Sequence, residues 1–126
     1  MLFRSLGLVR YHDYEGVAFN LDERERIVQS LGDGAMLILR NHGTLTVGST
    51  IGEMFHRMYR LERACKMQIH AMTGGAELNS LPQEVIDHAM QQGREIYAKD
   101  GQAAGGELLW TALKRKLDRI DPDYAA

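Results

Sequence analysis

The sequence "AMLILRNHGTLTVG", residues 35–48, joins two apolar segments through a short polar turn. The first segment is continuously apolar, which is typical of a strand buried on both faces, and the second is rich in β-branched residues. Because only about three residues separate them, we predict an antiparallel hairpin in which Gly43 supplies a positive φ. This hairpin presents His42 at its tip.

A strand buried on both faces needs neighbouring strands and a covering layer. Before the hairpin, the segment "LGLVRYHDY", residues 6–14, is a candidate strand, although its apolar residues alternate poorly. The preceding chain is too short to provide many strands. If the partner strands are missing, residues 35–39 lose one or both strand neighbours. We predict that the isolated chain is oligomeric or aggregation-prone, because an exposed apolar edge favours association.

Four helices are predicted around the hairpin. The first begins near Asn20, its expected N-cap, and ends at Gly32. The clearest runs over about 50–72, where apolar residues recur at steps of three and four. We predict that Ser80 caps a third helix and that a fourth runs over about 107–120.

Composition narrows the class of protein. The chain has 126 residues, a net charge of -2 and a pI near 6.2, which gives no electrostatic case for binding nucleic acid or an anionic membrane. Cys65 is the single cysteine, so an internal disulfide and a site built on several thiolates are excluded. No apolar run is long enough to insert into a membrane, and we expect a cytoplasmic protein.

The residues alone allow two interpretations of the role of His42. Asn-x-Gly is common turn chemistry, which makes His42 an exposed turn residue. Alternatively, a rigid hairpin holds the imidazole as a metal ligand or general acid–base group. A zinc-type site takes about three protein ligands at about 2 Å, so the second reading requires two more ligands.

The other histidines do not obviously supply them. Glu53 and His56 can face the same way on the long helix, but the matched second pair that such sites use is missing. His70 lies roughly 21 Å from His56 along that helix, so the two cannot share an ion. We predict that His88 is a surface histidine. His12 is next to acidic residues in "YHDYEG", where a solvated loop is favoured over a small polar site.

Two segments nevertheless carry a resemblance. The hexapeptide "YHDYEG", residues 11–16, and "LILRNHGTLTVGSTIGEMFHRMYRLERACKMQI", residues 37–69, strongly resemble the class II aldolase/adducin family. The resemblance covers roughly residues 8–75, and the ending "WTALKRKLDRIDPDY" is similar to bacterial members. These segments are more similar in sequence to the adducin-like branch than to the sugar-phosphate aldolases.

The resemblance implies an α/β/α layered domain around a mostly antiparallel sheet, often assembled as a homo-tetramer. In enzymatic members, a divalent metal, typically zinc, is held by a His-x-His pair and by the histidine of the Asn-His-Gly turn. By that match His42 is the third metal ligand, and Asn41 and Gly43 shape the turn. The metal would act as a Lewis acid in carbon–carbon bond cleavage of small hydroxy-aldehyde or keto-acid substrates.

The sequence also departs from the family pattern, because residues 1–126 contain no His-x-His pair. The acid/base residue of the family's aldolases belongs to a preceding segment, so we assign no catalytic residue here. We therefore expect one partial α/β domain over residues 1–126, an antiparallel hairpin plus about four helices.

Three functions are consistent with this pattern. The first is an aldolase-like metal-site remnant that is inactive as an isolated chain. The second is a non-enzymatic, adducin-like assembly module of the actin-cytoskeleton type. The third is a metal-dependent aldolase, a lyase, that another chain completes.

Overall fold

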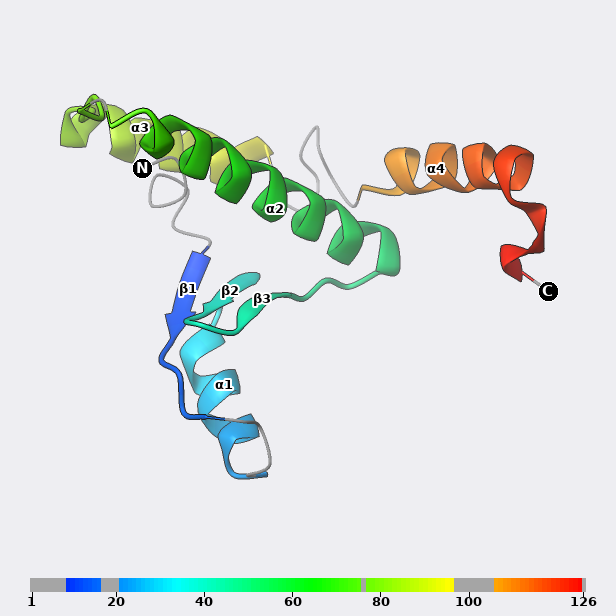
Figure 1. Ribbon diagram of the computed structural model, residues 1–126, viewed down its shortest axis with the longest axis horizontal. Helices are drawn as coiled ribbons and strands as arrows, with labels where there is room; N and C mark the ends of the chain where they lie inside the picture. The colour runs from blue at the N-terminus through cyan, green and yellow to red at the C-terminus, as the bar shows by residue number, and fades with distance from the viewer. Residues whose placement is uncertain (1–8, 17–20, 76, 97–105, 126) are drawn as a thin grey trace.

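The computed structural model of the chain describes residues 9–16, 21–75, 77–96 and 106–125 (Figure 1). Within these ranges the chain forms a three-stranded sheet and four α-helices, which confirms the predicted α/β class. The strands are β1 (Val9–His12), β2 (Met36–Leu39) and β3 (Gly43–Thr46). The helices are α1 (Glu23–Leu31), α2 (Ile51–Thr73), α3 (Gln83–Ile96) and α4 (Glu107–Ile120), followed by a short 3-10 helix, η2 (Pro122–Ala125).

The sheet is mixed, with strand order β1-β2-β3. The predicted hairpin is confirmed, because β2 pairs antiparallel with β3. The weak candidate strand is also real: β1 pairs parallel with β2, and His12 lies opposite Leu39. Helix α1 connects these parallel strands, as a crossover connection requires. β2 therefore has a paired strand on each side, and association of the chain stays a prediction.

The hairpin turn differs from the prediction in one residue. Asn41, not Gly43, adopts the left-handed conformation, with φ of 55°. Gly43 is already the first residue of β3 and lies opposite Leu39, so its backbone is extended. Asparagine is among the few side chains that enter the left-handed region readily, which lets the turn close before the glycine. The amide of His42 donates to the Leu39 carbonyl at 3.1 Å.

The sheet lies between two helical layers, with α1 and α2 on opposite sides (Figure 1). On one face, the His12 ring lies 2.9 Å from the Ser30 hydroxyl of α1. On the other, the Thr44 hydroxyl donates to Glu62 of α2 at 2.9 Å. Side chains alternate along each strand, so these contacts assign each helix to its own face. Among the described residues, the buried apolar core consists of Met36, Leu37, Leu61 and Ala64.

Two helix starts need correction. Helix α1 begins at Glu23 with Asp22 at its N-cap position, and Asn20 lies outside the described residues. Helix α3 begins at Gln83, with Pro82 accepting the first helical hydrogen bond, so the prediction that Ser80 caps it is wrong. The residue before a proline is disfavoured from helical backbone, which prevents an earlier start at Leu81.

The remaining boundaries match the predictions. Gly32 ends α1, with φ of 52° and its amide bonded to the Val28 carbonyl at 2.9 Å. Thr50 caps α2 by accepting the Glu53 amide at 3.1 Å. Among the residues that the structure describes, none of the helices combines the length and apolarity needed to span a bilayer.

Helix α4 stands away from the sheet and contacts the first turns of α2 (Figure 1). The Phe55 and Trp110 rings pack with centroids 5.4 Å apart. Gly106, the residue before α4, has φ of +62°, and a Cβ placed there would lie 2.8 Å from the Gly52 carbonyl oxygen. A backbone atom cannot move aside as a flexible side chain can, so the approach of α4 to α2 requires glycine at this position.

Replacing Gly106 with alanine should therefore undock α4. Gly75→Ala is the matched control, because Gly75 also has a positive φ, +66°, but nothing lies within 4 Å of its added Cβ. Both variants should lose about 1–2 kcal/mol of stability from the left-handed backbone. Only Gly106→Ala should also shift the fluorescence of Trp110, the single tryptophan of the chain. Equal emission spectra for the two variants would contradict the close-approach argument.

Candidate functional site

The parallel pairing of β1 and β2 places their carboxyl ends side by side. The amide of Arg40, which follows β2, donates to the carbonyl of His12, the last residue of β1, at 3.0 Å. The two segments that leave these strands, residues 13–16 and 40–42, therefore lie next to each other. Loops at the carboxyl ends of parallel strands are the usual place for ligand sites in α/β sheets.

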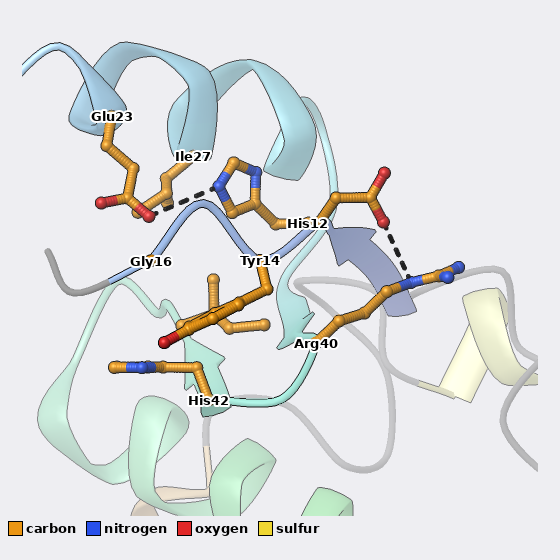
Figure 2. Close-up of a pocket in the computed structure, with 9 residues that line it drawn as sticks. His12, Tyr14, Gly16, Glu23, Ile27, Arg40 and His42 are labelled. Carbon is orange, nitrogen blue, oxygen red and sulfur yellow. Dashed lines mark ion pairs between the residues drawn. The ribbon is translucent and has the colours of Figure 1, made fainter.

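A hollow of about 50 Å³ lies between these segments and α1 (Figure 2). It is lined by His12, Asp13, Tyr14, Gly16, Glu23, Ile27, Leu39, Arg40 and His42. The volume suits one or two water molecules, whereas pockets for small-molecule ligands usually measure about 300–1,000 Å³. By itself the hollow is therefore too small to enclose a sugar-sized substrate.

His42 is exposed, and its side chain lines the hollow on the same side as the Tyr14 ring (Figure 2). The left-handed backbone of Asn41 and the short hairpin hold it there. Its assignment as a metal ligand, with Asn41 and Gly43 shaping the turn, stays a prediction.

The donor set around His42 is incomplete for a metal ion. Among the described residues, no group of three histidine, cysteine, aspartate or glutamate side chains is placed to hold one. The nearby Asp13 carboxylate is paired with Arg40 at 3.3 Å, and the His12 ring is directed towards α1. These residues therefore do not fit a metal centre without further ligands, and we derive no reaction step through a metal.

His12 is not in a solvated loop, so that reading of the sequence is wrong. Its side chain is only 6% exposed. The Nδ1 atom lies 2.9 Å from the Ser30 hydroxyl, while Nε2 is buried without a hydrogen-bond partner. Nε2 instead faces two carboxylates, Glu15 at 3.7 Å and Glu23 at 3.8 Å. A buried polar atom left without a partner costs on the order of 1–3 kcal/mol, so this arrangement calls for an explanation.

The Glu15 carboxylate is held by α1 as well. The Arg26 guanidinium donates to both of its oxygens, at 2.9 Å and 2.5 Å. The hydrogen bond from Arg26 lowers the pKa of Glu15 below its usual value, so the carboxylate stays ionised. This ion pair ties residues 13–16 to α1, which leaves a negative charge beside His12.

The other candidate pair, Glu53 and His56, does not form a ligand set. Glu53 turns back to the start of α2, where it accepts hydrogen bonds from the Ser49 amide at 2.6 Å and the Ser49 hydroxyl at 2.7 Å. These bonds and the neighbouring Arg57 lower the pKa of Glu53. Burial, together with Arg60 and Arg57, lowers the pKa of His56. The remaining two histidines, His70 and His88, are exposed on α2 and α3.

Known proteins are similar to this chain over most of its length. Residues 1–69 match the family described as the Class II Aldolase and Adducin N-terminal domain. A protein of Pseudomonas aeruginosa named after the class 2 aldolases is 43% identical over 94% of this chain and 46% of its own length. Its counterpart in Caulobacter vibrioides is 46% identical over 95% of this chain and 45% of its own length. Human gamma-adducin is 36% identical over 92% of this chain and 16% of its own length.

A solved structure agrees with the fold. The crystal structure of an aldolase II superfamily protein from Pseudomonas syringae superposes with a TM-score of 0.82 at 43% sequence identity. The match covers 95% of this chain and 47% of that chain. The chain therefore spans about half the length of the bacterial relatives that it matches.

The environment of Glu53 predicts a pH dependence of stability. Because the folded-state pKa is lowered, the stability contributed by the ionised carboxylate is present above the unfolded-state pKa and is lost as pH falls through the folded-state pKa. Glu53→Gln should therefore lower the free energy of unfolding at neutral pH, by an amount that shrinks towards acidic pH. Urea denaturation across a pH series measures this difference. A pH-independent difference, or the same profile for the exposed control Glu77→Gln, would refute the role of Glu53.

Proposed function

Because the chain belongs to the class II aldolase and adducin N-terminal domain family, we propose that it is an aldolase-type domain in which His42 is one ligand of a divalent metal site. Zinc is the expected ion. Asn41 and Gly43 shape the turn that presents the imidazole. The proposal is carried by one observation: His42 is exposed on a short hairpin turn, beside the hollow at the carboxyl ends of two parallel strands.

The remaining ligands would come from outside the described residues. One imidazole alone binds zinc weakly, and a catalytic zinc site commonly uses three protein ligands. We therefore propose that the isolated chain is inactive, and that a polypeptide carrying the family's His-x-His pair completes the site. The reaction class is carbon–carbon bond cleavage or formation on small hydroxy-aldehyde or keto-acid substrates.

A second candidate is a non-enzymatic assembly module. It is favoured by the similarity to gamma-adducin and by the incomplete donor set around His42 in the described part of the chain. In this reading the chain acts as a family-type homo-oligomer, and the exposed apolar side chains of α2, such as Ile69 and Met72, are available for subunit contacts. An assembly module keeps its oligomeric state in light scattering when His42 is replaced, and zinc titration distinguishes the two candidates because such a module needs no tightly bound Zn²⁺.

The metal-site proposal is tested by zinc titration in a calorimeter. The chain alone should bind Zn²⁺ weakly, and adding the segment of a family member that carries the His-x-His pair should produce tight, stoichiometric binding and lyase activity. His42→Ala should then weaken binding by at least about 100-fold, because losing a residue that binds the ion directly costs at least as much as losing a residue that supports it. His70→Ala, an exposed histidine of α2, is the control. Tight binding that survives His42→Ala would refute the assignment.

A further inference from the structure

His12 combines three features that no other described histidine shares. Its side chain is more than nine-tenths buried, its Nε2 atom has no hydrogen-bond partner, and that atom faces two carboxylates. The proposed function assigns no role to this residue. Its position at the end of β1, lining the same hollow as His42, suggests a role in holding the turn.

The surroundings of the ring determine where its proton lies. Carboxylates carry no proton to donate when ionised, so the Glu15 and Glu23 oxygens favour a proton on the nitrogen that they face, Nε2. In the neutral ring, Nδ1 is then the acceptor, and the Ser30 hydroxyl donates to it at 2.9 Å. Ser30 faces Nδ1 and Glu23 faces Nε2. Both residues belong to α1, so the ring links this helix to the end of β1.

The backbone of the same residue continues this link to the His42 turn. The carbonyl of His12 accepts the Arg40 amide at 3.0 Å, and the His42 amide in turn donates to the Leu39 carbonyl at 3.1 Å. Movement of His12 would therefore displace the first residue of the segment that carries His42. Figure 2 shows the two histidines on opposite sides of the hollow, with His12 directed to Glu23 of α1.

We propose that His12 is a positioning residue for the His42 turn. Its Nε2–H, directed at Glu23 and Glu15, holds the ring in place. The ring in turn fixes the main-chain carbonyl of His12, which accepts the Arg40 amide. The functional consequence, correct placement of a ligand imidazole, rests on the proposed role of His42. The physical claim, that the His12 side chain orders the turn, does not depend on any bound metal.

Two substitutions separate the two ring nitrogens. The amide nitrogen of glutamine reaches the position of Nε2, whereas that of asparagine reaches the position of Nδ1. His12→Gln should therefore keep the donor that faces the carboxylates, and His12→Asn should lose it. Amide hydrogen exchange, followed by NMR on the full chain without metal, reports how well the Arg40 and His42 amides are held.

In His12→Asn, exchange of the Arg40 and His42 amides should accelerate about tenfold, while the β2 amides before Leu39 keep their wild-type rates. His12→Gln should restore slow exchange at both positions. A purely structural role would accelerate all β2 amides together in both variants. That result, or equal exchange in the two variants, overturns the proposal.

Glu23→Gln provides a test that leaves His12 in place, with Glu25→Gln on the same helix as its control. Glu25 is exposed, whereas the Glu23 side chain is 14% exposed and 3.8 Å from Nε2. Glu23→Gln should accelerate exchange at Arg40 by several-fold, and Glu25→Gln should leave it unchanged. Nitrogen-15 spectra of the wild-type imidazole should show a proton on Nε2, and an unprotonated Nε2 overturns the assignment.

The two proposals fail separately. If zinc titration shows no role for His42 while the exchange rates follow His12 as described, the metal assignment falls and the positioning role stands. If His42 binds zinc but exchange at Arg40 does not respond to His12→Asn or Glu23→Gln, the positioning role falls alone.

Discussion

β1 and β2 run parallel, and the Arg40 amide that donates to the His12 carbonyl closes this pair at its carboxyl end. This backbone hydrogen bond brings together two segments that are separated by the whole of α1. Without this pairing, nothing would bring Tyr14 and His42 to the same hollow. The candidate site is therefore a consequence of strand pairing, and each side chain in it depends on that constraint.

The same constraint explains why a polar histidine is buried in a small core. The parallel connection requires a crossover helix, and α1 packs over the end of β1 where His12 projects. Ser30 and the two carboxylates supply polar surroundings that an apolar layer would lack. On the opposite face, Met36 of β2 lies beside Thr46 under α2, and Leu61 of α2 is fully buried, whereas Leu37 projects to the same face as His12. The face of the sheet towards α1 therefore carries both a fully buried apolar side chain, Leu37, and the polar contacts of His12.

Family membership and site geometry give complementary information about function. The match to class II aldolases and adducins assigns the hairpin with Asn41, His42 and Gly43 to a known family segment. The geometry adds that the described residues near His42 are engaged elsewhere, with Asp13 on Arg40 and His12 on α1. These two observations support the proposal that further ligands complete the site, and the chain spans about half the length of its bacterial relatives.

The features that depend on local sequence were predictable. Apolar spacing predicted α2 and α4. Turn chemistry predicted the hairpin, which places His42 at its exposed tip. Some errors were also local, because two neighbouring residues could fill one role. Asn41, for example, adopts the left-handed conformation expected of Gly43. Such alternatives differ by little energy, so the sequence leaves them open.

The parallel strand and the buried His12 were decided by tertiary structure alone. "LGLVRYHDY" alternates too weakly to be recognised as a strand, and it becomes one because β2 offers an unpaired edge. His12 stands among acidic residues that look solvated in sequence, and it is buried because α1 folds back over it. Both outcomes depend on contacts between residues far apart in the chain, and local pattern carries no record of them.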